Sequence, residues 1–437
     1  MTENDCSTDM KPLSKASKLS PRKRWLQILG PGIMFASACI GVSHLVQSTR
    51  AGAMAGFGLL WAILAANAAK YPFFEFGSRY ASAKGESLIE GYRTIGSHAS
   101  RIYLALTLGT CFFVMAAVGM VTGAFLDNLL GVSSRMGGAW TTEVTSGLFV
   151  GCTALLLLGK FNALDKLVKL LASVLLVSTV VAVVLTVTSP QVQPSLNTPS
   201  FDWTSSVGFA FVIALMGWMP SAVDLSTWNS FWTLERIQTT GYKPTLQETL
   251  AEFNWGFGIS VVLALGFLTM GAMLLHQTST DLPNGSAAFA AGIVGLYAKA
   301  IGPWSAPIMG AAAFSAMFST CVTVLDGYAR SLDRAWAVAT GRERSAANQR
   351  LALVVVAGGA LGIVLAFQGQ LKTLVDLATT LSFLIAPVIA WWNLKLVTND
   401  SFPAQARPGK WLKVWAWGGL VFLSVFSMVY LWTLIAP

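Results

Sequence analysis

Long apolar stretches recur along the whole chain, and this repetition constrains the fold more than any other feature of the sequence. Each stretch is about 20 residues long, which is enough for a helix to cross the ~30 Å hydrocarbon core of a bilayer. Only 11% of the residues are charged, whereas a soluble domain carries roughly 25%. The sequence therefore predicts an all-α integral membrane protein with about eleven transmembrane helices. The predicted spans are residues 28–53, 57–80, 102–126, 143–161, 166–188, 207–233, 252–275, 303–330, 351–368, 372–394 and 413–435.

The distribution of positive charge predicts how these spans are oriented. If the N-terminus lies in the cytoplasm and the spans alternate, the outer loops contain only Arg135, Lys299 and Lys372, while most other Lys and Arg residues fall in cytoplasmic segments. Positively charged loops stay in the cytoplasm during insertion. We therefore expect a multi-pass protein of the cell membrane with a cytoplasmic N-terminus and an extracytoplasmic C-terminus. The net charge of +9 then faces anionic lipid, so the expected partner is the bilayer and not nucleic acid.

The same pattern divides the chain into three parts. These are a basic cytoplasmic tail at residues 1–25, a transmembrane transport domain at 26–396 and an additional transmembrane helix at 410–437. The transport domain consists of two repeats, 26–190 and 204–396, with five spans each. Because five is an odd number, the two repeats have opposite orientations in the membrane.

The first span of each repeat contains residues that interrupt a helix. In the first repeat they are residues 30–32 (Gly-Pro-Gly) and 41–44 (Gly-Val-Ser-His), and in the second repeat residues 216–221 (Met-Gly-Trp-Met-Pro-Ser). Proline removes an amide donor, and glycine tolerates unwound backbone. Paired broken helices indicate a solute site near the bilayer midplane, because free backbone groups at that depth line a cavity or pack within protein. We therefore expect a secondary transporter; two ordinary kinks in packed helices are the alternative.

Motifs of enzymes and of ATP-driven pumps are missing from the sequence. It contains no nucleophile elbow, phosphate-binding loop, HExxH segment or paired-cysteine motif. Four of its five cysteines lie in predicted spans, so no disulfide framework is indicated. We expect neither enzymatic activity nor a cofactor, and we expect an ion or substrate gradient to drive transport.

Several of these segments resemble the Nramp family of proton-coupled divalent metal transporters. The resemblance extends over the first ten spans and is strongest at Gly30-Pro31, at residues 51–61 and at Met219-Pro220. It implies eleven or twelve helices in the LeuT-type 5+5 inverted repeat, with helices 1 and 6 broken. It also implies symport of a metal ion with a coupling proton or ion by alternating access.

The two metal-binding motifs of that family are only partly kept. The Asp-Pro-Gly-Asn motif of the first helix falls on residues 41–44, which lack both the Asp and the Asn. The Ala-x-x-Met-Pro-His motif of the sixth helix falls on residues 216–221, which keep Met-Pro but have Met in place of Ala and Ser in place of His. The chain is therefore identified as a divergent member of the family.

Groups beside the two breaks are the expected substrate site. An imidazole, a carboxylate and a thioether suit a soft or borderline divalent cation, so the expected metal ligands are His44, Met219 and Asp224. An ionisable residue inside a span, such as Asp224, is a functional hypothesis by default. The alternatives are a hydrogen bond to a neighbouring helix for His44, simple packing for Met219 and an ion pair for Asp224. The full predicted substrate-binding set is Gly41, Ser43, His44, Gly217, Met219, Ser221 and Asp224.

Three further ionisable residues are expected in a polar pathway or a gate, namely Arg50, Lys70 and Glu75. Arg50 ends the first span and can either snorkel or gate the outer mouth. Glu75 is spaced for an ion pair with Arg79, and Asp326 for one with Arg330, four residues later in each case. Lys70 has no partner at such a spacing, which leaves an ion pair with Asp326 or Asp376, or a place in the pathway.

The leading functional hypothesis is a secondary transporter for a divalent metal cation of the manganese or iron type, or for hydrated magnesium. Only Asp224 supplies negative charge near the breaks, and a dehydrated divalent cation is costly to hold with a single carboxylate. A small organic or anionic solute would instead use the positive ends of the half-helices, and such a carrier is the first alternative. A membrane sensor that transports nothing is the second.

Overall fold

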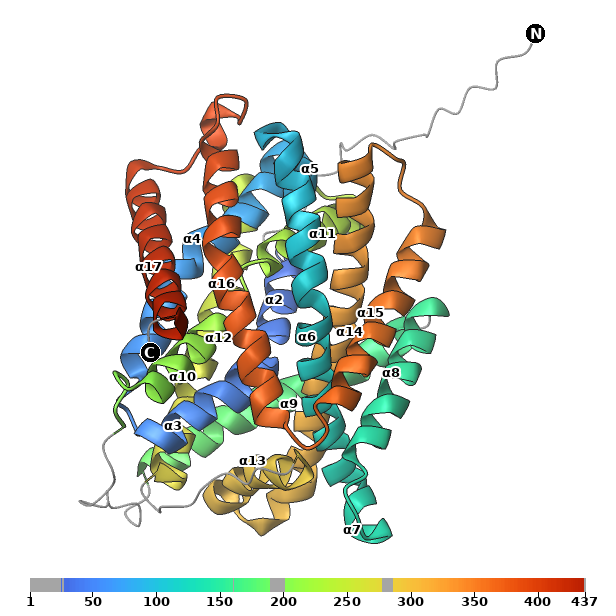
Figure 1. The fold of residues 1–437 in the computed structure, drawn as a ribbon, viewed down its shortest axis with the longest axis vertical. Helices are drawn as coiled ribbons and strands as arrows, with labels where there is room; N and C mark the ends of the chain where they lie inside the picture. The colour runs from blue at the N-terminus through green and yellow to red at the C-terminus, as the bar shows by residue number, and fades with distance from the viewer. Residues whose placement is uncertain (1–24, 26, 160, 189–200, 277–285, 436–437) are drawn as a thin grey trace.

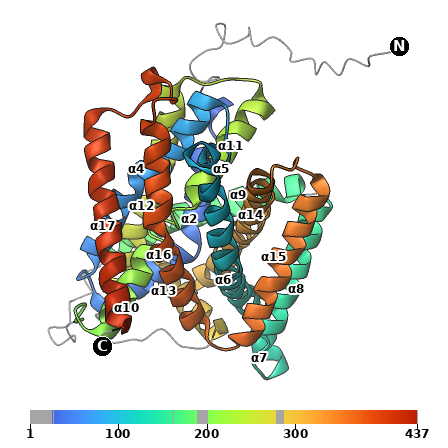
Figure 2. The same cartoon turned by 45° about the horizontal axis from the view of Figure 1, so that its top comes forward.

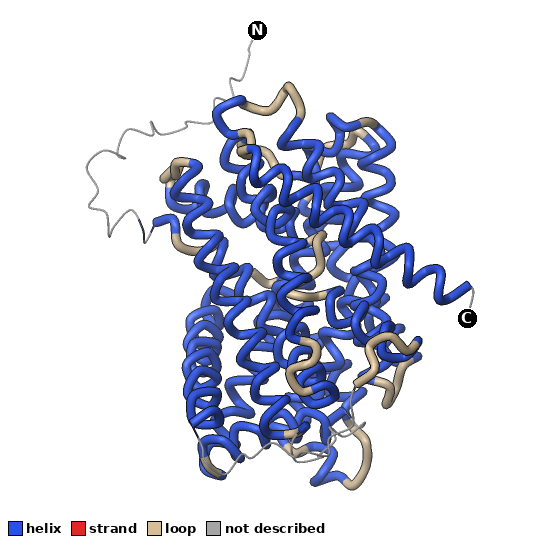
Figure 3. Tube along the Cα trace, turned by 90° about the vertical axis from the view of Figure 1, so that its left-hand side faces the viewer, coloured by secondary structure: helices blue, strands red, loops and turns tan. Residues whose placement is uncertain are grey.

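A computed structural model of the chain describes residues 25, 27–159, 161–188, 201–276 and 286–435, without the side chains of residues 97 and 161–172. Every regular element in these residues is a helix, as Figure 3 shows. The predicted all-α fold is therefore confirmed. The predicted tail at residues 1–25 lies outside the described residues except for its last residue.

Each of the eleven predicted spans coincides with a helix or with an interrupted helix. In chain order they are α2 (Pro31–Cys39) with η2 (Ile40–Ser48) and α3 (Thr49–Ala55), α4 (Leu60–Lys84), α6 (Ser97–Leu130), α8 (Thr141–Leu157), α9 (Phe161–Thr188), α10 (Ser206–Gly217) with α11 (Leu225–Thr240), α12 (Leu246–Leu274), α14 (Ala306–Thr340), α15 (Ala346–Ala366), α16 (Leu371–Thr398) and α17 (Lys410–Ile435). Among the described helices, six are long and apolar enough to cross a membrane by length and composition alone. Of the other spans, the first and the sixth are interrupted, α8 has only 17 residues and α4 contains more charged residues.

Three α-helices lie where the sequence predicted only loops: α5 (Leu88–Ile95), α7 (Val132–Met136) and α13 (Ser286–Ile301). The short helix α5 begins at a capping box in which Ser87 and Glu90 satisfy each other's backbone amides. Helix α13 has 16 residues, below the ~20 that mark a spanning segment, and it crosses the bottom of the bundle in Figure 1. A search for long apolar stretches therefore passes over it.

The two interrupted helices lie in the middle of the bundle. Helix α12 packs along α2, η2 and α3, and α4 packs along α11 and α12, while α16 packs along α10. The connections from α14 to α15 and from α16 to α17 lie at the top of Figure 1, and the connection from α15 to α16 lies at the bottom. These successive helices therefore run in opposite directions, as successive membrane spans must.

Helices α3 and α12 cross with their backbones in direct contact. A Cβ atom added to Gly52 of α3 would lie 2.7 Å from the amide nitrogen of Ala272, and one added to Gly271 of α12 would overlap the carbonyl oxygen of Thr49. Small residues allow membrane helices to approach this closely. The crossing fixes the second part of the first interrupted helix against α12.

Helix α17 lies at the edge of the bundle (Figure 2), at the position of the eleventh predicted span. It packs on α4 and α16, with Gly419 against the backbone of Ala69. Its outer side chains, such as Trp411 and Trp432, are largely exposed, as is expected of a helix that faces lipid. The centre of the bundle is thus formed without it.

Candidate functional site

The first interrupted helix bends at Gly41. Helix α2 ends at Cys39, and Gly41 has φ −60° and ψ −129°, outside the helical range, within the wide-turn helix η2. The backbone passes close to α14 at this point, since a Cβ atom added to Gly41 would lie 2.7 Å from Cγ2 of Thr320. The predicted break in the first span is confirmed, and it is confined to a single residue.

The second interrupted helix has a longer gap. Helix α10 ends at Gly217 and α11 begins at Leu225, and residues 218–224 between them are not helical. Gly217 lies against α16, where an added Cβ atom would be 2.6 Å from the carbonyl carbon of Thr379. The predicted break in the sixth span is confirmed, and it leaves the last carbonyl groups of α10 without partners inside the helix.

Lys70 of α4 occupies the end of α10. Its fully buried ammonium donates hydrogen bonds to the carbonyl oxygens of Met216 at 2.6 Å, Gly217 at 2.7 Å and Ser221 at 3.0 Å. A cation at this place is favourable because the C-terminal end of a helix carries partial negative charge. Lys70 therefore satisfies the backbone that the break leaves open.

The acidic residues considered as partners of Lys70 are paired elsewhere. Asp326 forms the predicted ion pair with Arg330 of its own helix, at 2.7 Å, and Asp376 pairs with Arg50 at 2.6 Å. Of the two alternatives left open for Lys70, an ion pair with one of these residues is therefore not the one that the structure shows. A hydrogen bond from a side chain to the backbone of another helix does not depend on the spacing of residues in the sequence, so spacing alone does not predict it.

A small cavity of about 30 Å³ lies between the two breaks. Ser43 and Val42 line it from the first break, and Ser221 and Ala222 line it from the second. The hydroxyl of Ser43 also donates to the carbonyl oxygen of Pro220 at 3.1 Å, so that the two breaks touch. This volume is enough for about two water molecules.

His44 is fully buried and bonds to α12 instead of lining this cavity. Its Nδ1 atom lies 2.8 Å from Oγ of Ser43, and its Nε2 atom lies 2.8 Å from the carbonyl oxygen and 3.0 Å from the hydroxyl of Ser260. A carbonyl oxygen only accepts, so Nε2 carries a proton in this arrangement. The structure thus places His44 in the alternative role considered for it, a hydrogen bond to a neighbouring helix.

Met219 and Asp224 also lie outside the lining of the cavity. The sulfur of Met219 is 4.0 Å from the hydroxyl of Ser48. Asp224 precedes the first residue of α11; its Oδ2 accepts a hydrogen bond from Tyr328 at 3.3 Å, and its Oδ1 is buried without a partner. The described part of the chain holds no group of three or more His, Cys, Asp or Glu residues suited to a metal. Metal binding by His44, Met219 and Asp224 stays a prediction.

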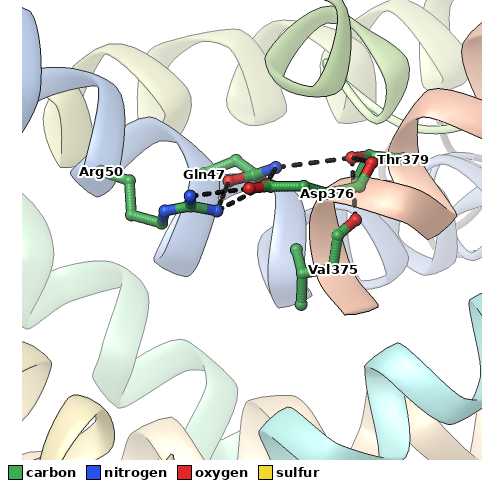
Figure 4. Close-up of polar contacts among 5 residues, drawn as sticks. All are labelled: Gln47, Arg50, Val375, Asp376 and Thr379. Atoms are coloured by element: carbon green, nitrogen blue, oxygen red, sulfur yellow. Dashed lines mark hydrogen bonds and ion pairs between the residues drawn. The ribbon is translucent and has the colours of Figure 1, made fainter. Parts of the chain in front are cut away.

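Arg50 of α3 and Asp376 of α16 form a bidentate ion pair, shown in Figure 4. Its two bonds measure 2.6 Å and 2.9 Å. Gln47 donates to the same carboxylate at 3.0 Å and accepts from Arg50 at 2.8 Å, and the guanidinium lies 5.0 Å from the ring centre of Phe211 on α10. The cluster joins both interrupted helices to α16, and a gating role of Arg50 stays a prediction.

The predicted ion pair of Glu75 with Arg79 on α4 is confirmed, at 2.5 Å and almost fully buried. Arg79 also donates to the carbonyl oxygen of Ala406, in the connection between α16 and α17, at 2.7 Å. Both side chains are thus occupied with one another and with this connection. The pair fixes the end of α4 to the segment that precedes α17.

Glu252 of α12 is a contact that the sequence reasoning missed. Its carboxylate accepts hydrogen bonds from the backbone amides of Gly30 at 2.9 Å and Gly32 at 2.8 Å, at the N-terminus of α2. The first amides of a helix lack partners within it, and an anion there is stabilised by the helix dipole. An acidic residue at the start of a predicted span was the available signal.

A family model described as natural resistance-associated macrophage protein-like, or Nramp, matches residues 32–433. The chain belongs to the Nramp family. This family consists of membrane transporters for metal ions and not of enzymes, and the chain is accordingly a multi-pass membrane protein. The predicted resemblance is confirmed over nearly the whole sequence.

Other Nramp-like and LeuT-type proteins are similar to this chain. An uncharacterized protein of Pasteurella multocida (strain Pm70) is 32% identical over 408 residues, which cover 92% of this chain and 91% of the relative. A manganese transporter of Eremococcus coleocola, solved in complex with an aromatic bis-isothiourea substituted compound, gives a TM-score of 0.69 at 15% identity and covers 93% of this chain and 86% of its own. MhsT in complex with L-phenylalanine gives a TM-score of 0.57 at 11% identity, covering 92% and 97%. The LeuT-type fold is therefore confirmed.

Proposed function

We propose that this Nramp-family chain carries a divalent metal cation, of the manganese or iron type or as hydrated magnesium, across the cell membrane by alternating access. The observation that carries the proposal is the small cavity where the two interrupted helices meet, with Ser43 and Ser221 among its lining residues. Hydroxyl and carbonyl oxygens are ligands that hard divalent cations accept. Family membership and the likeness to a manganese transporter support the same class of cargo.

The ion is proposed to keep part of its water while bound. The cavity offers neutral oxygen atoms, and a dehydrated divalent cation is costly to hold without several negative charges. Asp224 supplies a carboxylate oxygen that is buried and has no hydrogen-bond partner. Met219 lies within the non-helical segment 218–224 and Asp224 ends it, so a shift of this segment is the step we propose for bringing both side chains to the ion. His44 would join them by releasing Ser260.

Access is proposed to alternate between two faces of the bundle. The ion pair of Arg50 with Asp376 closes one side of the site, which the positive-inside rule makes the extracytoplasmic side. The same rule places the N-terminus in the cytoplasm and the C-terminus outside. Breaking this pair, while the contacts of Glu75 and Arg79 persist on α4, would open the outer path.

Uptake into proteoliposomes that contain a metal-sensitive dye tests the proposal. We expect the wild-type protein to admit Mn²⁺ or Mg²⁺, and we expect Asp224→Ala to lower the rate by about tenfold or more, which corresponds to a rise of about 1.4 kcal/mol in the free-energy barrier to transport. The matched control is Glu343→Ala, which removes an exposed acidic residue from the connection between α14 and α15 and should leave uptake unchanged.

The same vesicles distinguish the alternatives. Accumulation of a radiolabelled amino acid or small anion without any dye response would contradict a metal cargo and favour the carrier of organic or anionic solutes. The absence of flux for metals, amino acids and anions alike would favour a membrane sensor.

A further inference from the structure

We propose that the indole rings of Trp218 and Trp228 close the cavity between the two breaks, Trp218 on its extracytoplasmic side and Trp228 on its cytoplasmic side. Each ring would swing aside to let the cargo pass on its own side. This inference rests on the proposed function and deepens it, because it names the side chains that open and close the path next to the site.

The cavity is closed to solvent by the residues that line it. None of the twelve described residues in its lining is more than 8% exposed, so an ion enters or leaves only when a lining side chain moves. Ten of the twelve are Ala, Val, Leu, Ser or Thr, and the other two are Trp218 and Trp228. These two rings are by far the largest side chains of the lining, so their movement opens the widest path.

The two rings lie at opposite ends of the second break. Trp218 directly follows α10, and Trp228 lies in the first turn of α11. In the orientation given by the positive-inside rule, α10 descends from the extracytoplasmic side and α11 continues toward the cytoplasm. The lining residues Ser221 and Ala222 come between the two rings in the chain. The rings therefore flank the cavity along the direction of transport.

Trp218 is held against α16, on the inner side of the ion pair of Arg50 with Asp376. Its Nε1 donates a hydrogen bond to Oγ of Ser382 at 2.8 Å. Ser382 lies six residues after Asp376 in α16, which places it about 9 Å further along the helix axis. The extracytoplasmic side thus has two layers, with the ion pair outside and the indole next to the cavity.

Trp228 is held against α14 in a similar way. Its Nε1 donates to Oγ of Ser331 at 2.9 Å, and its ring lies on Gly327, where an added Cβ atom would be 2.8 Å from the ring atom Cδ2. Two turns further along α11, Glu235 pairs with Arg330 of α14 at 2.8 Å. The cytoplasmic side therefore repeats the order of the other side, with an indole next to the cavity and an ion pair beyond it.

The contacts that hold the rings suit side chains that move. The indole N–H of each ring bonds to a neutral hydroxyl, and such a bond contributes only modestly to stability, so it can break in every transport cycle. Ser382 stays satisfied when Trp218 leaves, because its hydroxyl also donates to the carbonyl oxygen of Ala378 at 3.0 Å. The two partners belong to different helices, so one ring can be released while Trp228 or Trp218 on the other side stays bound.

Chemical labelling of an introduced cysteine in the full-length protein tests the two closures. Val114→Cys places a thiol of similar volume in the lining of the cavity, on α6. Cys6→Ser is included so that the other thiols are the four buried native cysteines of the described residues, which define the background. A charged, membrane-impermeant thiol reagent is applied to right-side-out vesicles for the extracytoplasmic side and to inverted vesicles for the cytoplasmic side.

Removal of one ring should open one side only. We expect Trp218→Ala to speed labelling from the extracytoplasmic side by about tenfold or more and to leave the cytoplasmic rate unchanged, because the rate follows the population of the open state. Trp228→Ala should have the reverse effect. The matched control is Trp392→Ala, which removes a buried tryptophan of α16 outside the lining and should change neither rate.

Milder variants decide the question if an alanine variant does not fold. Trp218→Phe and Ser382→Ala remove the same hydrogen bond, so each should speed extracytoplasmic labelling by about threefold, and the double variant should be no faster than either. Trp228→Phe and Ser331→Ala should do the same from the cytoplasmic side. Size-exclusion chromatography and thermal melting show which variants are folded.

The outcomes separate this inference from the function on which it rests. One-sided acceleration on the predicted side in the variants of each ring would support it. Equal acceleration from both sides, acceleration on the opposite side, or none at all would overturn the roles of Trp218 and Trp228 and leave metal transport standing. Labelling requires no cargo, so the absence of Mn²⁺ uptake by the wild-type protein would overturn the proposed function without changing the labelling result.

Discussion

The two helix breaks of this Nramp-family protein are related by the repeat but differ in how their backbone is satisfied. At the first break only Gly41 departs from helical geometry, and the adjoining polar side chains of Ser43 and His44 bond to protein groups. At the second break residues 218–224 are unwound, and a lysine from another helix holds the carbonyl oxygens. The first break thus acts as a bend, whereas the second offers an arrangement of oxygen atoms that suits a cation.

The largest expected effect follows from Gly217→Ala at the second break. The added methyl group would collide with the backbone of Thr379, which cannot rotate away, so we expect a loss of about 1–3 kcal/mol in stability and at least a tenfold loss of uptake. Thermal melting and vesicle uptake measure both. The control Gly258→Ala adds a methyl group where no atom lies within 4 Å.

A rescue experiment sharpens this prediction. The obstruction at Gly217 is the main chain, so adding Thr379→Ala should not restore uptake. Recovery of wild-type rates in the double variant would show that the contact at the second break is softer than the structure indicates.

A smaller effect is expected from Gly41→Ala at the first break. The three atoms nearest to the added methyl group all belong to the side chain of Thr320, with Cγ2 at 2.7 Å and Oγ1 at 2.9 Å. We expect uptake to fall by about threefold, as a moderate packing defect would cause. Here the second change Thr320→Ala should restore uptake, with Thr320→Ala alone as the control. A loss as severe as that of Gly217→Ala would contradict the distinction between the breaks.

The smallest effect is expected from Ser43→Ala, which removes the hydroxyl that the carbonyl oxygens of Cys39 and Pro220 and the Nδ1 atom of His44 share. One hydrogen bond contributes about 1 kcal/mol, so the melting temperature should fall by a few degrees. The control Ser146→Ala removes a hydroxyl that bonds only within α8. An unchanged melting temperature for Ser43→Ala would mean that the Ser43 hydroxyl does not stabilise the contact between the breaks.

The breaks were predictable from the sequence because their causes are local. Gly41 and the Gly-Trp-Met-Pro segment at residues 217–220 disrupt a helix whatever surrounds them. The eleven spans were also predictable, because the length and the apolar composition of a span are properties of that segment alone. Helix α13 was not predicted, because its 16 residues are too few to cross a membrane, although its composition is apolar.

Contacts between helices were not predictable in the same way. The bond of Lys70 to the end of α10 depends on how α4 packs against that helix, and the bond of His44 to Ser260 depends on α12. An unwound segment also removes the regular angular spacing from which the facing of side chains is inferred. Sequence reasoning therefore named Met219 and Asp224 beside the break, but it did not establish whether they line the cavity.

Helix α12 holds the first interrupted helix near both of its ends. Glu252, early in α12, binds the amides that begin α2, and Gly271, late in α12, touches the backbone of α3. Because both contacts are made by the same helix, the distance between the two contact points on the first interrupted helix stays constant. Any flexing at Gly41 must therefore bow the helix sideways, toward or away from α14, and cannot lengthen it.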